Sequence, residues 1–298
     1  MVLIVLANGL SLAVPKIVAS AIDSFTAGTF DLNLILEEFI AVSLLIFTLT
    51  YGQSIAQTYA SERVARDLRA QIIAKISEQD YAYIERATPS RLLTNLTSDV
   101  DAVKTFVSQA IASIVSSVFL IIGSSILLLL INWKLALVVL LIVPIIGVTF
   151  SFIFKKVSKL FKVSQETVDW LNKVINESIL GASLIRLLNS QSQEYSKFIA
   201  ASTRSKEIGL SILSLFATLI PIITLTSNLA ILAILMLGGH FVIAGSMSLG
   251  DFAAFNGYVS ILVFPIIVIG FMSNVIAQAT TSYGRILEVL KAPLRESK

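Results

Sequence analysis

The sequence has no cysteine and a single histidine, His240. Without cysteine there can be no disulfide, no thiolate metal site and no cysteine nucleophile. One histidine also excludes a metal site built from several imidazoles. His240 itself lies in a connection rich in Gly and Ser, where a solvated histidine is a simpler interpretation than a catalytic one. The sequence predicts no catalytic residue and no metal ligand.

Charge is also scarce: Asp, Glu, Lys and Arg make up 14% of the 298 residues, against about 25% in an ordinary soluble domain. No stretch matches the G-x-x-x-x-G-K-[ST] loop that binds the phosphates of ATP in many ATPases. These two deficits exclude a typical soluble enzyme and give no sign of an ATP-hydrolysing site in this chain.

Apolar residues are abundant instead, at 56% of the chain with a mean hydropathy of +0.87. This content excludes a disordered chain. A bilayer core about 30 Å thick needs about 20 apolar residues per helical span. Pro15, Pro144, Pro221 and Pro265 are expected to kink the spans that contain them. Six stretches qualify as spans: Val2–Ile22, Leu34–Ile55, Phe106–Ile131, Leu135–Phe154, Leu210–Leu237 and Phe252–Ile276.

The 22 Lys and Arg residues are unevenly distributed along the chain. Seven lie in 59–105, nine in 155–206 and four in 285–298, whereas the connections 23–33, 132–134 and 238–251 together contain one. Cytoplasmic connections are enriched in Lys and Arg. The sequence therefore predicts a multi-pass protein of the cell membrane with both termini in the cytoplasm, and no nucleic-acid partner.

The two long basic connections, about 59–105 and 155–206, have the periodicity of helices. In the first, apolar residues recur every four positions and predict a helix that continues to about Ile84. Thr88 is expected to cap, and Pro89 to begin, the return helix. In the second, Gly181 interrupts the descending helix. The predicted fold class is an all-α membrane protein with six transmembrane helices and two long cytoplasmic helical hairpins, each with a short segment at its tip.

Seven stretches, taken in order and spacing, resemble the transmembrane domain of ATP-binding cassette (ABC) exporters. The segment 90–100 is similar to the family's "G-x-(L/I)-x-S-R-(L/I)-x-x-D-(V/T)" return helix. It departs from that pattern at Asn95, where arginine is usual, and at Pro89 and Ser90, which replace the customary glycine. The resemblance covers nearly the whole chain, and the stretches are 62–69, 79–85, 90–100, 132–137, 177–188, 248–252 and 282–288.

This resemblance implies a mechanism and a set of partners. In the family, two six-helix domains pair as a homo- or heterodimer above two cytosolic ATPase domains, which bind ATP and Mg²⁺, and no cofactor is expected in this chain. Residues 1–290 would form one six-span domain, and 291–298 would start a linker to an ATPase domain that is absent from the sequence. We expect a truncated half-transporter, although the ATPase could be a separate subunit. The tips would contact the ATPase domain through Tyr83, Ile84, Glu85, Arg86, Gly181, Ala182, Ser183, Leu184 and Ile185.

Polar residues within spans are costly, so each is a hypothesis for a substrate cavity. The candidates are Lys16, Thr224, Asn228, Phe271, Asn274 and Gln278. Hydrogen bonding between helices is the alternative for the polar residues, and a lipid-facing position is the alternative for Phe271. Lys16 could also pair with an acidic residue. Because the spans contain few fixed charges, the predicted substrate is amphipathic or lipid-like, and a peptide is also possible.

Two other functions are compatible with the pattern of spans. An ion-coupled secondary transporter would bind its ions near the middle of the membrane at interrupted helices, but the spans have few acidic residues. A membrane scaffold could dock cytosolic proteins through the two tips and would need no central cavity.

Overall fold

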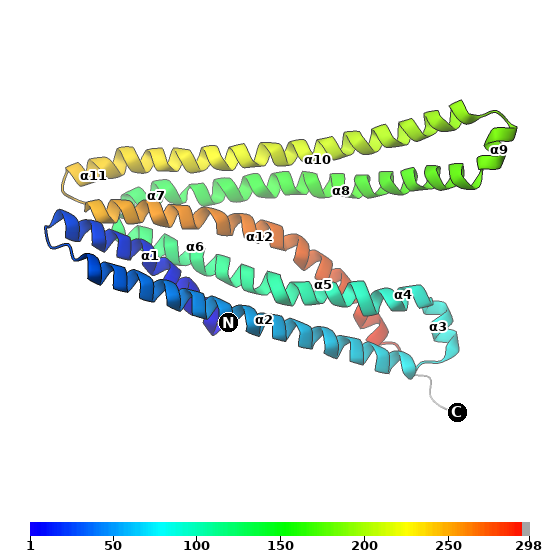
Figure 1. The fold of residues 1–298 in the computed structure, drawn as a ribbon, viewed down its shortest axis with the longest axis horizontal. Coiled ribbons are helices and arrows are strands. Elements are labelled where there is room, and N and C mark those ends of the chain that lie inside the picture. Colours follow the sequence, from blue (N-terminus) through cyan, green and yellow to red (C-terminus); the bar gives the residue numbers. More distant parts are fainter. Residues whose placement is uncertain (294–298) are drawn as a thin grey trace. The chain divides into compact units, whose positions relative to one another are not determined.

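The computed structural model describes residues 1–293, with the side chains of all of these except Ala82 and Ile142, and every regular element in that part of the chain is helical (Figure 1). The helices are α1 (Val2–Thr26), α2 (Leu32–Ser77), α3 (Tyr81–Ala87), α4 (Pro89–Thr94), α5 (Val100–Thr105), α6 (Ile111–Ile131), α7 (Trp133–Leu140), α8 (Ile142–Leu180), α9 (Ala182–Leu187), α10 (Gln191–Ala233), α11 (Gly239–Ile243) and α12 (Leu249–Leu290). Three π-helical turns lie between them: η1 (Asn95–Asp99), η2 (Phe106–Ala110) and η3 (Ile234–Gly238).

Within the described residues, six helical stretches are long and apolar enough to cross a membrane, which confirms the predicted number of spans. They contain the six apolar stretches of the sequence and extend beyond several of them. Their bounds are Val2–Thr26, Leu32–Ser77, Pro89–Ile131, Trp133–Leu180, Gln191–Ile243 and Leu249–Leu290.

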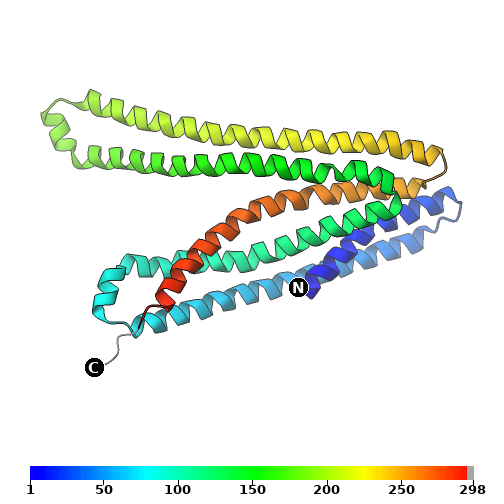
Figure 2. The same cartoon turned by 180° about the vertical axis from the view of Figure 1, so that it is seen from behind.

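The chain divides into two compact units. The first contains residues 1–143 and the chain from Ala230 onward, and in it α1 packs on α2, α6 and α12, while α6 packs on α12. The second unit, Pro144–Leu229, is a long helical hairpin made of α8, α9 and α10. Figure 2 shows the same helices from behind.

The tip of the first hairpin differs from its prediction. The helix α2 ends at Ser77 and does not continue to Ile84, because a separate short helix, α3, begins at Tyr81. Asp80 starts this helix by accepting a hydrogen bond from the backbone N–H of Tyr83 at 2.8 Å, so its side chain replaces an intrahelical bond. Residues 77–80 are all polar and carried a local signal for this break, but Ile84 returns to the four-residue spacing, so periodicity alone did not reveal it.

The return helix begins at Pro89, as predicted, but Thr88 does not cap it through its side chain. Thr88 has a φ of 61°, and the residue before a proline is sterically kept out of the helical region. Proline at the first helical position needs no N–H partner. The chain therefore turns sharply between α3 and α4.

The fourth span is interrupted near Pro144. The helix α7 ends at Leu140, one residue forms a turn, and α8 begins at Ile142. Proline has no N–H to bond the carbonyl four residues earlier, here that of Leu140, and its ring crowds that carbonyl. The break is the local consequence of the proline that was expected to kink this span. The other three, Pro15, Pro221 and Pro265, lie inside α1, α10 and α12 without interrupting them.

The second hairpin has the predicted interruption at Gly181, between α8 and α9. A Cβ at this position would lie 2.9 Å from the carbonyl oxygen of Glu177. Glycine therefore lets the chain turn at the end of α8 while its backbone stays close to this carbonyl oxygen of the last helical turn. The predicted linker 291–298 lies for its larger part, 294–298, outside the described residues.

Candidate functional site

A polar cavity of about 560 Å³ lies between the C-terminal half of α12 and the return helix of the first hairpin. Asn274 and Gln278, both predicted from sequence, line it from α12. They share one face of that helix with Thr281 and Arg285, since the four recur at intervals of three or four residues. The full lining is Thr94, Ser98, Asp99, Asn274, Ala277, Gln278, Thr281, Ser282 and Arg285.

An ion pair between Asp99 and Arg285 closes one side of the polar cavity. The side chain of Asp99 is 1% exposed and that of Arg285 is 39% exposed. Nε of Arg285 donates to Oδ2 of Asp99 at 2.9 Å, and its Nη2 donates both to Oδ1 of Asp99 and to Oγ of Ser282, the latter at 3.0 Å. This two-pronged contact is the strongest geometry that arginine and a carboxylate can adopt.

The two charges of the pair stabilise each other. Burial acts to raise the pKa of Asp99, but hydrogen bonds from Arg285 and Ser282 and the positive charges of Arg285 and Arg91 outweigh it, so the pKa is lowered. The hydrogen bond to Asp99 raises the pKa of Arg285, against the opposing effect of burial. Both groups therefore stay ionised at neutral pH, and the cavity contains a fixed dipole rather than a titrating acid.

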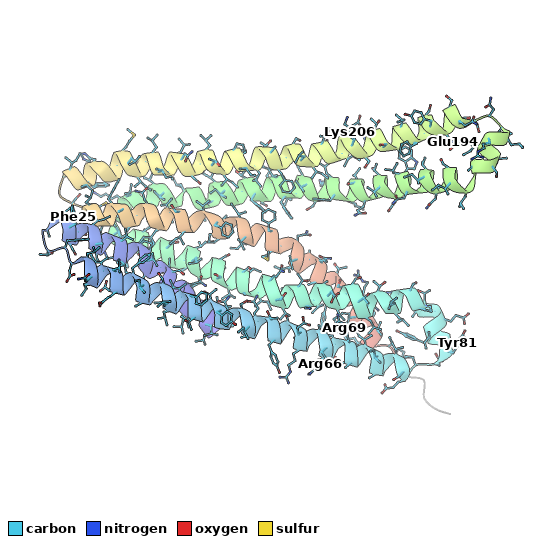
Figure 3. All side chains as sticks on the ribbon, viewed as in Figure 1. Phe25, Arg66, Arg69, Tyr81, Glu194 and Lys206 are labelled. Carbon is cyan, nitrogen blue, oxygen red and sulfur yellow. The ribbon has the colours of Figure 1, made fainter. Side chains whose placement is uncertain are left out.

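Further ion pairs hold the end of α12 and the first hairpin together. Arg91 of α4 contacts Glu288 of α12 at 2.5 Å. Within the hairpin, Arg69 of α2 (labelled in Figure 3) bonds Asp101 of α5 at 2.8 Å. Beneath these polar contacts, Ala65, Ile72, Leu92, Val100, Val103, Ile286 and Val289 form a buried apolar cluster. The last turns of α12 are thus packed into the first hairpin.

Asp99 and Arg285 were not predicted as site residues, although a local signal for Asp99 was present. Leu92, Asn95, Asp99 and Val103 recur at helical spacing, so Asn95 and Asp99 lie on the apolar face of the return helix. Polar groups on such a face need partners. The identity of the partner, 186 residues away, could not be deduced from the spacing.

Asn95 is buried without a hydrogen-bond partner. Its side chain is 1% exposed, and neither Oδ1 nor Nδ2 is hydrogen-bonded among the described residues. The amide lies in the π-helical turn η1, one turn before Asp99. It occupies the position where the ABC exporter pattern has arginine, and its shorter side chain leaves both polar atoms unsatisfied.

Replacing Asn95 with leucine is expected to raise the free energy of unfolding by about 1–2 kcal/mol, because two methyl groups replace two unsatisfied buried polar atoms. Asn132→Leu is the control. Asn132 caps α7 by accepting from the N–H of Leu135 at 3.1 Å, and its loss should cost about 1 kcal/mol. Denaturant titration in detergent, followed by circular dichroism, measures both changes. A loss of stability in Asn95→Leu would contradict the expectation.

The other predicted cavity residues do not line the polar cavity. Nζ of Lys16 forms an ion pair with Oδ1 of Asp251 at 3.0 Å, which ties α1 to the first turn of α12. Phe271 is 43% exposed on α12, one turn before Asn274. Thr224 and Asn228 are exposed on α10 in the second unit. Their role as substrate contacts stays a prediction.

The two tips predicted to couple to an ATPase are separate short helices, α3 and α9. In α3, Ile84 packs against the apolar cluster of the hairpin, while Glu85 and Arg86 are exposed. Tyr81, which the sequence analysis did not select, is 80% exposed and is labelled in Figure 3.

No side chain of α9 is buried. Leu184 is 58% exposed, and Leu180 and Leu187 beside it are 85% and 82% exposed. Ala182 and Ser183 are exposed too, and Gly181 and Ile185 are half-buried. The second tip therefore presents apolar side chains with no cover from its own unit.

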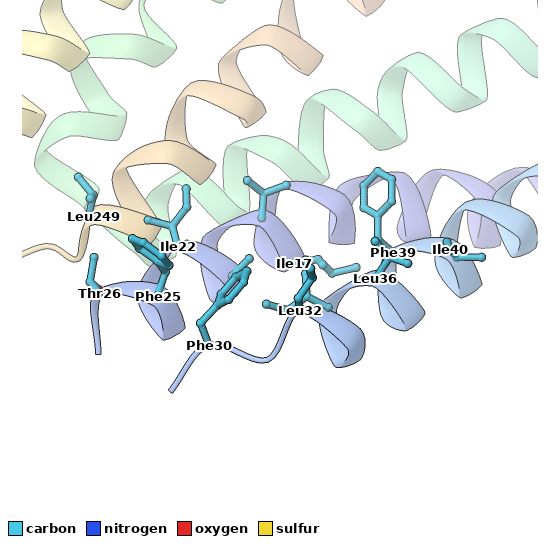
Figure 4. Close-up of a pocket in the computed structure, with 13 residues that line it drawn as sticks. Ile17, Ile22, Phe25, Thr26, Phe30, Leu32, Leu36, Phe39, Ile40 and Leu249 are labelled. Atoms are coloured by element: carbon cyan, nitrogen blue, oxygen red, sulfur yellow. The ribbon is translucent and has the colours of Figure 1, made fainter. Parts of the chain in front are cut away.

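A second hollow, of about 590 Å³, lies between α1 and α2 (Figure 4). Phe25, Phe30 and Phe39 are among its lining residues, and Thr26 is the one lining residue with a polar side chain. This apolar groove has almost nothing with which to orient a polar ligand. Within residues 1–293, no group of three or more His, Asp or Glu side chains could hold a metal ion.

Six helical stretches that are long and apolar enough to cross a membrane, with two hairpins that extend beyond the apolar spans, define a multi-pass membrane domain with a polar cavity on its last helix. The profile of the family described as the ABC transporter transmembrane region matches residues 1–266. The chain therefore belongs to that family.

Curated relatives are ABC transporter proteins. The chain is 28% identical over 252 residues to the ABC transporter ATP-binding protein YfiB of Bacillus subtilis, which covers 85% of the chain and 44% of the relative. It is 24% identical over 299 residues to the multidrug resistance-like ATP-binding protein MdlA of Escherichia coli. This alignment covers 98% of the chain and 50% of the relative. It is 22% identical over 295 residues to the ATP-dependent lipid A-core flippase of Syntrophus aciditrophicus. This alignment covers 97% of the chain and 49% of the relative. The chain spans about half the length of these relatives.

Proposed function

We propose that this chain is the membrane-spanning, substrate-translocating domain of an ATP-driven exporter. The observation that carries the proposal is the pair of short helices, α3 and α9, at the ends of two long hairpins, with exposed apolar side chains at the second tip. Exposed apolar clusters mark surfaces that bind another protein. The expected partner is a cytosolic ATPase domain, which would hold the ATP and Mg²⁺.

The contacts of the first hairpin support a route for the coupling. Arg91–Glu288 and Asp99–Arg285 join this hairpin to the end of α12, which lines the polar cavity with Asn274 and Gln278. A displacement of the α3 tip would thus reach the cavity through packed helices rather than through a flexible loop.

The polar cavity supports a substrate with a polar part, and the apolar spans that follow its two lining helices into the membrane support a substrate with an apolar part. An amphipathic or lipid-like molecule has both, and a peptide can have both. The relatives named for multidrug resistance and for lipid A-core transport agree with this class. A homo- or heterodimer of such domains, in the cell membrane and with both termini in the cytoplasm, completes the proposed transporter.

Cysteine cross-linking tests the docking of the tips. The chain has no native cysteine, so Ser183→Cys and Tyr83→Cys each introduce a single thiol. With the ATPase domain or subunit co-expressed and carrying its own single cysteine, we expect a cross-link at each tip. Thr29→Cys, an exposed site in the connection between α1 and α2, is the control and should give none. A complex that transports substrate but cross-links at neither tip contradicts the proposal, and a tip that captures other cytosolic proteins would favour the scaffold alternative.

A further inference from the structure

Four lysines form a stripe on α8 where this helix leaves its apolar span. They are Lys155, Lys156, Lys159 and Lys162, and they follow directly after Phe154, the last residue of the predicted fourth span. Their spacing places them on one face of the helix, and all four are exposed. We propose that this lysine stripe binds the anionic headgroups of phospholipids in the adjacent leaflet.

The stripe lacks the acidic partners that neutralise basic residues elsewhere. None of its lysines forms an ion pair within the described part of the chain, and the next acidic residue is Glu166. Most other basic residues that flank the spans are paired: Arg63 and Arg66 with Asp67, Arg69 with Asp101, Lys104 with Glu62, Arg204 with Glu207 and Arg285 with Asp99. The stripe is therefore a concentration of uncompensated positive charge, and it attracts anions from outside the chain.

The opposite face of α8 fixes the orientation of the stripe. Ile153 and Val157 on that face are 7% and 1% exposed, so burial determines which side of the helix faces outward. On the outward side, Nζ of Lys156 lies 4.5 Å from the centre of the Phe152 ring. Phe152 is 61% exposed, and an aromatic ring beside lysines suits the boundary between hydrocarbon and headgroups.

The direction of the chain brings the ammonium groups toward the membrane. Side chains of an α-helix lean toward its N-terminus, and α8 runs from the span outward, so its lysines lean back toward the bilayer. Lys162 lies roughly 12 Å beyond Phe154 along the helix, at about 1.5 Å per residue. That distance is close to the roughly 10 Å over which salt screens a charged surface. All four lysines can therefore interact with an anionic surface.

The helix α10 provides a natural contrast, because it runs toward its span. Arg204 and Lys206 precede the predicted fifth span by a few residues, and their side chains lean away from the membrane for the same geometric reason. Lys206 is labelled in Figure 3. Arg204 also contacts Glu207 at 3.7 Å. The lysine stripe and these two residues of α10 thus lie at a similar distance from a span, but they differ in the direction in which their side chains lean and in their ion pairs.

Native mass spectrometry of the whole chain in detergent tests the proposal, with phosphatidylglycerol and phosphatidylcholine of the same acyl chains in competition. We expect the wild-type chain to prefer phosphatidylglycerol and the double variant Lys159→Gln/Lys162→Gln to lose this preference by about 25-fold, since each lysine near an anionic membrane contributes roughly five-fold. The charge-conserving variant Lys159→Arg/Lys162→Arg should keep the preference for phosphatidylglycerol. The matched control Arg204→Gln/Lys206→Gln removes the same charge and should change the preference for phosphatidylglycerol by less than about three-fold.

Three outcomes overturn the proposal. Equal binding of the two lipids by the wild-type chain, or equal losses in the stripe variant and the matched control, would mean that the stripe is only a solvated face. Glycerol 3-phosphate is added as a soluble arm. If it displaces phosphatidylglycerol at the same concentration, the site recognises a free anion and not a membrane lipid.

Discussion

Replacing Arg285 with alanine is expected to lower the free energy of unfolding by about 3 kcal/mol, because it leaves the carboxylate of Asp99 buried without its partner. The side chain of Asp99 is 1% exposed, so water cannot replace the lost hydrogen bonds. This loss of free energy lies at the lower end of the range for buried ion pairs, because the side chain of Arg285 is 39% exposed and partly screened by solvent. Denaturant titration in detergent, followed by circular dichroism, measures the loss.

Arg91→Ala is the matched control, because the side chains of the Arg91–Glu288 pair are 54% and 66% exposed. Exposed pairs contribute at most about 1 kcal/mol. The double variant Asp99→Asn/Arg285→Ala removes the buried charge and should recover part of the stability lost in Arg285→Ala. Equal losses of unfolding free energy in Arg285→Ala and Arg91→Ala would contradict the importance of burying the Asp99 carboxylate.

The same pair predicts a dependence on pH. The pKa of Asp99 is lowered in the folded chain. Its contribution to stability is therefore fully present above the unfolded-state pKa of about 4, and it is lost as the pH falls through the still lower folded-state pKa. In Arg285→Ala the unpaired carboxyl can protonate, so the difference in stability between wild type and variant should shrink below about pH 4. A difference that is constant from pH 7 to pH 3 would contradict this assignment.

Replacing Gly250 with alanine is expected to cost about 3 kcal/mol, because a Cβ there would collide with the carbonyl oxygen of Ala19 and the carboxylate of Asp23. Asp23 accepts hydrogen bonds from the N–H of Gly250 at 2.8 Å and from Oγ of Ser248 at 2.7 Å. Making room for the methyl group would separate α1 from the first turn of α12 and weaken both bonds. Thermal unfolding in detergent reports the effect as a lower Tm.

Gly284→Ala on the same helix is the control. A Cβ at Gly284 meets no atom within 4 Å, and alanine favours a helix over glycine by about 0.5–1 kcal/mol. Gly284→Ala should therefore be neutral or stabilising. If both substitutions had the same effect, helix propensity and not the close contact of α1 and α12 would determine the response at Gly250.

Much of the fold followed from the sequence because its signals are local. Hydropathy over about 20 residues located the six spans, and helical periodicity identified both hairpins. Gly181 marked the break at the second tip correctly. The break between Ser77 and Tyr81 was missed although residues 77–80 are all polar and Asp80 can cap a new helix, because the apolar spacing resumes at Ile84.

The candidate site was only partly accessible from sequence. Asn274 and Gln278 were selected because polar amides are costly within an apolar span. Nothing in the sequence connected them to Asp99 and Arg285, which complete the same cavity. Phe271 shares their helix and nearly their face, yet it lies outside the cavity lining because it is one turn further along α12 from Asp99 and Arg285.

By itself, the sequence determined that this chain is an all-helical membrane domain with six spans, because burial of apolar residues in a bilayer depends on composition over short stretches. It also determined the family, whose profile matches residues 1–266. Tertiary structure alone decided which charges meet: Arg285 pairs with Asp99 across 186 residues, and Lys16 with Asp251 across 235. Within residues 1–293 it also left the side chain of Asn95 without a hydrogen-bond partner. Separation along the chain carries no information on distance in space, so these contacts appear only once the helices are packed.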